Sequence, residues 1–253
     1  MFSQISLILT LYGIFTFLEV LFPGEKHQSF VGRGRNLIFG AILFIVGTWF
    51  VSAFTNIFPL DLRLLNSRGL FFSMGILVSY LFLLDFLFYW WHRAQHHFSK
   101  LWVIHMLHHS DAELNVTSSM RSHFLERPIQ FLLITLPVEY FIGIDGLAIA
   151  ILPFFLTFGL FFTHSNLRIR FGYFTSVLCG PQLHRIHHSL EGKHQDKNFA
   201  QFFPVFDIIF GTYYKPAYNE FPKTGIKDMK SDIVIGEAVV YPFKFWLGLL
   251  GKR

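Results

Sequence analysis

Long apolar stretches separated by short polar segments dominate the first half of the chain. Residues 2–22, 37–58 and 69–91 each provide about the 20 mostly apolar residues that a helix needs to cross the hydrocarbon core of a bilayer. Pro23 ends the first stretch and Pro59 ends the second. The first stretch lacks the basic start and the small-residue cleavage site of a signal peptide, so we interpret it as a retained helix. The pattern therefore predicts three membrane-spanning helices.

A fourth apolar stretch, residues 129–163, is too long for a single span. Its centre, GIDG at residues 143–146, is typical of a turn. We therefore expect a helical hairpin that enters and leaves on the same side, either as two spans or as two shorter helices that reach only part of the way. The predicted fold class is an all-α integral membrane bundle of about four or five membrane helices with a cytoplasmic, histidine-rich helical cap.

The composition agrees with a membrane protein. The chain is 53% hydrophobic and only 15% charged, whereas soluble domains carry about 25% charged residues. Its formal charge of +5 favours a face towards anionic lipid or an acidic partner. The Lys and Arg residues are scattered and no nucleic-acid-binding motif accompanies them, so no nucleic-acid partner is expected. The single cysteine, Cys179, excludes an intramolecular disulfide.

The positions of the basic residues predict the orientation, because cytoplasmic loops are enriched in Lys and Arg. Segment 24–36 holds three of them and segment 59–68 holds two. The region after Trp91, outside the hairpin, holds the other 16 of 21. The end of the third helix and the tail are therefore predicted to be cytoplasmic, in a bacterial inner membrane or, in a eukaryote, the endoplasmic reticulum.

We expect one membrane domain that covers the whole chain. It comprises three membrane helices in 1–91, cytoplasmic histidine motifs in 92–128, a membrane hairpin in 129–163, and a further cytoplasmic histidine motif and tail in 164–253. The aromatic-rich segment 233–250 of the tail is expected to lie along the membrane interface.

Nine of the 13 histidines fall in three short motifs. HRAQHH supplies His92, His96 and His97, HMLHHS supplies His105, His108 and His109, and HRIHHS supplies His184, His187 and His188. Residues three and four apart share one face of a helix, so each motif can direct its rings to one place. Neutral imidazole is the commonest metal ligand among side chains. The spacing therefore predicts a metal centre.

The number of histidines indicates two ions. Eight convergent imidazoles exceed what one tetrahedral zinc site uses. His164 is a plausible ninth ligand, because it lies where the hairpin re-emerges from the membrane. Imidazole suits iron, zinc, copper and nickel, so the ligand type leaves the metal open. Buried core histidines, or a surface run that binds stray metal, would explain one motif but poorly explain three.

Other residues are candidates to support the ligands. Asp85 lies two turns before His92 on the same helix face, where it could accept a ring N–H or offset metal charge, or else reach water at the helix end. His97 points about 100° away from His96 on a helix and is expected beside the ligands. His123 could be either ligand support or a core residue. Five acids close to the motifs could also contribute, or could simply be solvated: Asp111, Glu113, Glu126, Asp196 and Asp207.

The segments that carry the histidines resemble a known family. DFLFYWWHRAQHH, HMLHHSDAELNVTSSMRSHFLE and HRIHHS…DKNFAQFFPVFDIIFGTYY are similar to the fatty acid hydroxylase / sterol desaturase superfamily, from about Asp85 to Tyr214. The resemblance implies a membrane oxygenase with a non-haem di-iron centre, and it implies that Asn198 holds a water or orients a ligand. The implied ligands are His92, His96, His105, His108, His109, His164, His184, His187 and His188. Leu160 and Arg168 stand where some hydroxylases have a tenth histidine.

The resemblance also implies a reaction. The expected activity is O2-dependent hydroxylation, or desaturation, of a C–H bond in a lipid such as a sterol, a fatty acyl chain or an ether lipid. Hydroxylation is favoured because it needs only one positioned C–H bond. Two iron ions are the expected cofactor, and zinc could replace them in a purified sample.

The chain has no recognisable flavin, nicotinamide or haem module, so electrons are expected from a separate reductase, ferredoxin or small cytochrome. The Lys-rich segment 193–230 is either a docking face for this donor or a solvated, lipid-facing tail. The alternative function is a metal-binding membrane protein without oxygenase activity, with a structural zinc site or a role in metal transport. The apolar spans argue against transport, because a transported ion needs polar residues along its path.

Overall fold

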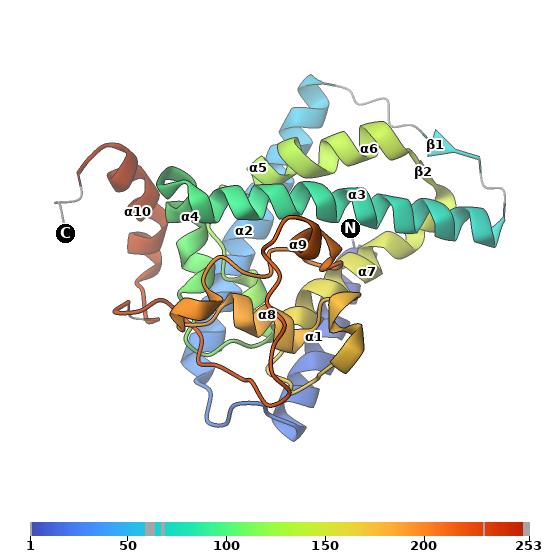
Figure 1. The fold of residues 1–253 in the computed structure, drawn as a ribbon. Helices are drawn as coiled ribbons and strands as arrows, with labels where there is room; N and C mark the ends of the chain where they lie inside the picture. Colours follow the sequence, from blue (N-terminus) through green and yellow to red (C-terminus); the bar gives the residue numbers. More distant parts are fainter. Residues whose placement is uncertain (1, 59–63, 67–68, 230, 250–253) are drawn as a thin grey trace.

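Four long apolar helices organise the molecule (Figure 1). The computed structural model describes residues 2–58, 64–66, 69–229 and 231–249. Within these residues, the helices long and apolar enough to cross a membrane are α1 (Phe2–Leu21), α2 (Phe30–Ile57), α3 (Leu70–His97) and α7 (Gly146–His164). The predicted all-α class and the number of membrane helices are therefore confirmed.

The second helix begins seven residues earlier than its apolar run suggested. Ser29 caps α2 by accepting a hydrogen bond from the N–H of Gly32 at 3.2 Å. Arg33, in the first turn, pairs with the buried Glu19 of α1 at 2.8 Å. These two interactions make the polar sequence GRGRN helical. Pro59, predicted to end this span, lies outside the described residues.

Residues 126–164 form two helical arms joined by a turn, as predicted, and their path through the membrane stays a prediction. The first arm is divided into α5 (Glu126–Gln130), the π-helical turn η2 (Phe131–Thr135) and α6 (Leu136–Ile142), and the second arm is α7. At the tip, the two-residue strand β2 (Ile144–Asp145) pairs in parallel with β1 (Leu64–Leu65). Asp145 also caps α7 and hydrogen-bonds Ser73 in the first turn of α3. The tip therefore lies at the end of the bundle where α3 begins.

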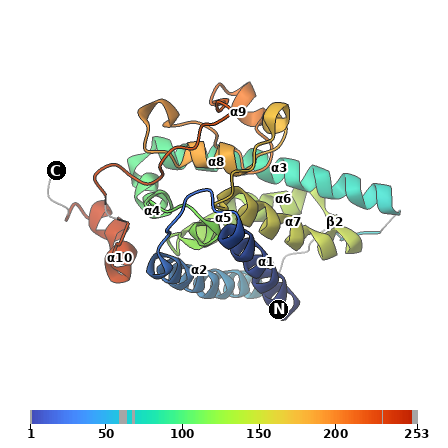
Figure 2. The same cartoon turned by 90° about the horizontal axis from the view of Figure 1, so that it is seen from below.

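Short helices form a cap at the opposite end. They are α4 (Ser99–His109), η1 (Val116–Met120), η3 (Gly172–Ser176), α8 (Pro181–His187), η4 (Gly192–His194), α9 (Val205–Ile209) and α10 (Ile235–Trp246). Figures 1 and 2 show α4, α8 and α10 at the side of the molecule away from β2. The loop between α1 and α2 joins the cap, because Gly24 donates to Asn166 O at 2.7 Å and Glu25 pairs with Arg185 at 2.7 Å.

The main core lies between α3 and the hairpin. Leu77, Leu81 and Leu84 of α3 pack against Val138 and Leu152 of the hairpin arms. The last helix, α10, is amphipathic and packs on α4, with Ala238 buried and Val240 and Trp246 exposed. This pattern is compatible with the interfacial tail, which stays a prediction.

Candidate metal centre

The fold brings nine of the histidines together in two adjoining groups. They come from the C-terminal end of α3, from α4, from the last residue of α7 and from α8 with its cap. The first group is His92, His96, His105, His109 and His187, and the second is His108, His164, His184 and His188. Within each group the ligand-capable atoms all lie within 4.8 Å of one another. Eight of them come from the three motifs and the ninth is His164, and together they are the nine ligands that the family resemblance implied.

Each of the two H-x2-H-H motifs supplies both groups. His109 enters the first group and His108 the second, whereas His187 enters the first and His188 the second. Neighbouring residues on a helix point about 100° apart, and residues four apart share a face. The H-x2-H-H spacing therefore lets one helix turn form part of the wall of two sites.

Most of the rings are held by a hydrogen bond from Nδ1 to an acceptor outside the groups. His92 donates to Phe199 O, His187 to Lys197 O and His164 to Leu160 O, each at 2.8 Å, and His108 donates to Arg121 O at 3.3 Å. A carbonyl oxygen can only accept, so the proton of each neutral ring lies on Nδ1. This leaves Nε2 as a bare lone pair directed into the group, as in histidines that bind metals.

The distances between the Nε2 atoms fit bound cations. His164 Nε2 lies 3.1 Å from His108 Nε2 and 3.0 Å from His184 Nε2. His108 and His164 have already committed their protons, so two lone pairs face each other. Two nitrogens bound at right angles to one ion at about 2.1 Å would lie about 3.0 Å apart. A cation between them would turn this repulsion into coordination.

The first group gives the same indication. His109 Nε2 is 3.1 Å from His96 Nε2, 3.2 Å from His105 Nε2 and 3.1 Å from His187 Nε2. His92 Nε2 is buried and has no hydrogen-bond partner among the described residues. An orphaned buried nitrogen is costly unless something occupies the space in front of it. The donor set of both groups therefore fits metal ions.

The environment keeps the rings neutral. Burial and neighbouring histidines hold the pKa well below its usual value for five rings outside the spanning helices, His108, His109, His184, His187 and His188. A histidine binds a metal only when it is neutral. The site can therefore bind ions at neutral pH without first losing protons.

Glu126 holds the ring of His105. Its Oε1 accepts the Nδ1–H of His105 at 3.0 Å, and both of its oxygens accept from Gln95 Nε2, at 3.0 and 2.9 Å. The carboxylate is 3% exposed, so it is a buried negative charge beside the ligands. The sequence left it among five nearby acids, because only the fold distinguishes it from the others.

One short segment orients three ligands of the first group. We name residues 196–203 the orienting segment. Lys197 O and Phe199 O accept from His187 and His92, and Asp196 Oδ1 lies 3.3 Å from His96 Nδ1. The histidine ring lowers the pKa of the Asp196 carboxyl. The backbone of this segment therefore contributes more to the site than its side chains.

Two buried carboxylates fix the orienting segment. Asp85 accepts hydrogen bonds from the N–H groups of three successive residues, Gln201 at 2.7 Å, Phe202 at 3.1 Å and Phe203 at 2.6 Å. Asp207 accepts from the N–H groups of Phe199 at 2.7 Å and Ala200 at 2.9 Å. Asp85 thus supports the site through the backbone, and neither accepts a ring N–H nor reaches water as the sequence had suggested.

The other three supporting candidates differ in their positions. Asn198 has φ +58° and pairs with both backbone groups of Tyr214, so it shapes the orienting segment without touching a ligand ring. His97 is exposed and lies against Phe98. The ring of His123 donates to Val239 O of α10 at 3.1 Å. The link of His123 to the site is its backbone carbonyl, which accepts the N–H of Glu126. Neither of these two histidines belongs to a group.

Arg121 supports the second group and was missed in the sequence. Its side chain is buried and donates to Leu107 O, Ser110 Oγ, Asn36 Oδ1 and Ser231 O, while its own carbonyl accepts from His108. It therefore connects α4, α2 and the tail at the ligand. The only signal in the sequence was a basic residue between the second motif and the hairpin.

A smaller cluster of metal-ligand types lies at the surface. Glu191, His194 and Glu220 converge there. However, Lys193 Nζ lies 2.6 Å from Glu220 and 3.3 Å from Glu191. Burial raises the pKa of the Glu220 carboxyl. Hydrogen bonds from Lys193, the Ala217 N–H, Tyr214 and His194 outweigh this effect and lower the pKa of Glu220 to about 2. The ammonium group already occupies the place of a cation.

Comparison with known proteins agrees with this geometry. The chain is 28% identical over 225 residues to an ornithine lipid hydroxylase of Rhizobium tropici, a match that covers 82% of this chain and 66% of that protein. It is 31% identical over 129 residues to the human alkylglycerol monooxygenase and 30% identical over 129 residues to that of Xenopus tropicalis. Each of these two matches covers 51% of this chain and 28% of the relative. No solved structure matches. The chain thus spans only part of the length of these relatives.

The family model for fatty acid hydroxylases matches residues 77–212 of the chain. This range includes all nine histidines of the two groups. The resemblance of the histidine motifs is therefore confirmed. The chain belongs to the fatty acid hydroxylase family.

Proposed function

We propose that this protein is a membrane-bound, O2-dependent lipid hydroxylase whose two histidine groups hold two iron ions. The observation that carries the proposal is the pair of adjoining groups, in which five and four imidazoles place their ligand-capable nitrogens within 4.8 Å of one another. A structural zinc site needs only about four ligands. Membership of a lipid-oxidising family supports the same conclusion.

The reaction would take place in a site closed by aromatic side chains. A pair of bound irons would supply the activated oxygen that side chains alone cannot. The chain's residues hold the rings and exclude water: Phe199 lies 5.5 Å from the ring of His92 and 5.1 Å from that of His96, and Trp102 lies 5.0 Å from that of His96. Glu126 and Asp196 place negative charge beside the otherwise neutral imidazoles.

The substrate is proposed to be a membrane lipid. The ligands lie at one end of apolar helices, so a C–H bond could reach them from the bilayer. The relatives named for ornithine lipid and alkylglycerol suggest two candidates, an acyl chain of an amino-acid-containing lipid and an ether lipid. We propose hydroxylation rather than desaturation, because hydroxylation needs one positioned C–H bond.

The histidine end is proposed to face the cytoplasm. The first turns of α2, which contain Arg33 and Arg35, lie at the same end as the cap, whereas β1 and β2 lie at the other. This arrangement follows the positive-inside rule.

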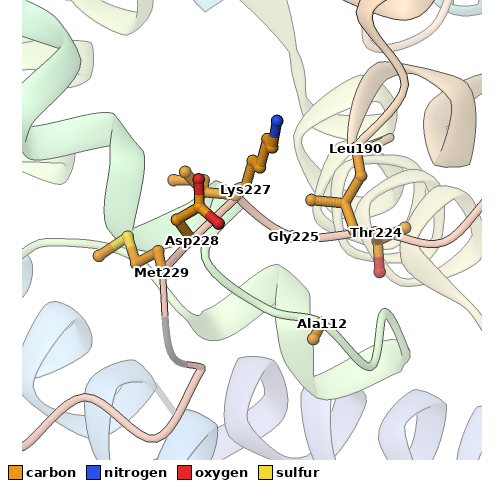
Figure 3. A pocket seen from close by; sticks show the side chains of 8 residues that line it. Ala112, Leu190, Thr224, Gly225, Lys227, Asp228 and Met229 are labelled. Carbon is orange, nitrogen blue, oxygen red and sulfur yellow. The ribbon is translucent and has the colours of Figure 1, made fainter.

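The electron donor is proposed to dock on the segment that covers the second group. Gly225 donates to His188 O at 3.2 Å, so the backbone of segment 224–229 contacts the backbone of a ligand residue. They line a surface hollow of about 560 Å³ (Figure 3), where Lys227 is exposed. Lys223 is also exposed. An acidic electron carrier would be attracted to these charges.

This docking face can be tested with a double substitution. Lys223→Glu together with Lys227→Glu should raise the apparent KM for a reduced acidic ferredoxin and leave turnover with dithionite unchanged. Lys244→Glu, on α10, is the matched control. Equal ferredoxin dependence in all three proteins would refute the docking face.

The proposed function is tested by metal content and oxygen use together. The protein is reconstituted anaerobically with iron in lipid nanodiscs, and oxygen uptake is measured after adding reductant and a panel of ornithine, ether and acyl lipids. We expect about two irons per chain and a hydroxylated product by mass spectrometry. Stoichiometric zinc, with no oxygen uptake on any lipid after iron loading, would favour the structural metal site instead.

A further inference from the structure

Two short segments of the cap expose large apolar side chains. In and after η3, Tyr173 is 92% exposed and Phe174 is 70% exposed, and in α9 Ile209 is 64% exposed. Six residues of these segments are exposed and apolar, and we call them the apolar foot: Tyr173, Phe174, Val177, Leu178, Ile208 and Ile209. In water such a surface would be unfavourable, so something apolar must cover it.

The position of α9 along α3 indicates what covers the foot. Phe206 packs on Phe82 of α3, with ring centroids 4.8 Å apart, and on Phe86 at 5.4 Å. Phe82 precedes His92 by ten residues on one continuous helix, a distance of about 15 Å along the axis. Phe206 also lies 6.4 Å from the ring of Tyr89, so α9 lies beside the stretch of the spanning helix that leads from Phe82 up to the first ligand.

The other end of α9 lies near the level where aromatic residues meet the headgroups. Phe210, which follows α9, packs on Trp90 with ring centroids 4.8 Å apart. Trp90 is partly exposed and has the guanidinium of Arg93 5.7 Å from its ring, an arrangement typical of a membrane interface. Ile208 and Ile209 lie in the chain between Phe206, which packs on Phe82, and Phe210, which packs on Trp90.

The η3 segment is attached to the same region and has a basic rim. Cys179 donates to Phe202 O at 2.8 Å, which joins the end of this segment to the orienting segment that leads into α9. Lys215 lies 5.9 Å from the ring of Tyr173. Arg170 lies nearby in the chain and packs on Tyr218. Basic residues beside exposed aromatic residues fit an anionic lipid surface.

We propose that the apolar foot is a membrane-inserted part of the cap, which penetrates the leaflet next to the metal centre and is covered by acyl chains. It is continuous with the lipid-facing surface of α3 and adds to the four spanning helices. The proposal rests on the membrane placement in the proposed function, but it does not depend on oxygenase activity.

The test measures the depth of probes in nanodiscs. Single cysteines are introduced in a Cys179→Ala background and labelled with an environment-sensitive fluorophore, at Ile209→Cys and Phe174→Cys in the foot. Val78→Cys, on the exposed face of α3, is the control within the bilayer, and Gln195→Cys, on the exposed surface of the cap, is the aqueous control. Quenching is compared for nitroxide-labelled lipids and for iodide in the water, in phosphatidylcholine with phosphatidylglycerol.

We expect the two foot probes to follow Val78, with strong quenching by lipid nitroxides and weak quenching by iodide. Iron content checks that each labelled protein keeps its metal centre, whether or not it oxidises lipid. Iodide quenching of the foot probes equal to that at Gln195 would overturn the proposal. Resistance to both quenchers would also overturn it, because a second protein copy would then cover the foot.

Discussion

The ring of His109 stacks on the ring of His188, with centroids 4.3 Å apart and planes 19° apart. His109 belongs to the first group and His188 to the second. The two sites therefore share a wall of imidazole, without an intervening layer of apolar side chains. This contact makes the two groups one continuous cluster of histidines.

Removing a ligand should remove metal as well as activity. We expect His187→Ala to abolish turnover and to lower bound iron from about two per chain, because the first group loses an inward nitrogen. His97→Ala is the matched control, since this histidine lies outside both groups. Metal analysis and oxygen uptake check both proteins. Full iron content with normal turnover in His187→Ala would refute the ligand assignment.

Glu126 should matter through the ring that it holds. Glu126→Gln keeps an acceptor oxygen but removes the charge and allows an N–H to face His105, so we expect roughly 10–100-fold weaker metal binding or activity. Glu139→Gln is a control at a carboxylate outside the groups. Iron titration followed by optical spectroscopy gives the affinity. Unchanged affinity in Glu126→Gln would mean that the hydrogen bond to His105 has no influence on the metal.

The orienting segment should depend on its two buried acids. In the wild-type protein, three backbone N–H groups donate to the Asp85 carboxylate. In Asp85→Asn, the NH2 group of the amide would face these N–H groups, and two donors would meet. We expect a loss of about 1–3 kcal/mol in the free energy of unfolding, together with weaker iron binding at the first group. Asp207→Asn should act in the same direction, whereas Asp228→Asn, at an exposed position, should change little. Denaturation in detergent, with and without iron, measures both effects.

The metal-free protein should lose stability in acid. The pKa of His108, His109, His184, His187 and His188 is lowered in the folded state, so the unfolded chain binds more protons once the pH falls below about 6.5. The stabilising contribution of neutral rings is therefore full above that pH and is lost progressively below it. Unfolding followed from pH 8 to pH 5 tests this, and a stability that rises on acidification would contradict it.

Gly159 of α7 should be required for the packing of the orienting segment. A Cβ at this position would lie 2.3 Å from Cε1 of Phe202, so Gly159→Ala should lower the thermal stability. Adding Phe202→Leu should recover part of the loss. Gly75→Ala is a control within α3, because a Cβ there meets nothing within 4 Å. A destabilisation that Phe202→Leu does not relieve would point to another cause.

Local spacing in the sequence was sufficient to predict the membrane helices and the histidines that converge. Both depend on residues close together in the chain, which share a helix face or fill one span. The supports of the ligands could not be predicted in this way. Phe199 and Lys197 act through backbone carbonyls, which every residue type has. Arg121 and Glu126 are distinguished only by the fold, which buries them beside particular rings.

The early start of α2 has a similar explanation. Arg33 is unfavourable in a membrane helix considered alone, and the apolar run accordingly predicted a later start. Its pairing with the buried Glu19 depends on a neighbouring helix, which hydropathy along one segment does not include.

The division of both H-x2-H-H motifs between the two groups has a consequence for metal loading. Because α4 and α8 both supply rings to both groups, the first ion to bind would also fix the helices that form the other site. Binding of the second ion would then cost less conformational entropy, because these helices are already ordered. Iron should consequently bind cooperatively, so that partly loaded samples contain mainly empty and doubly occupied chains, with few that hold a single ion.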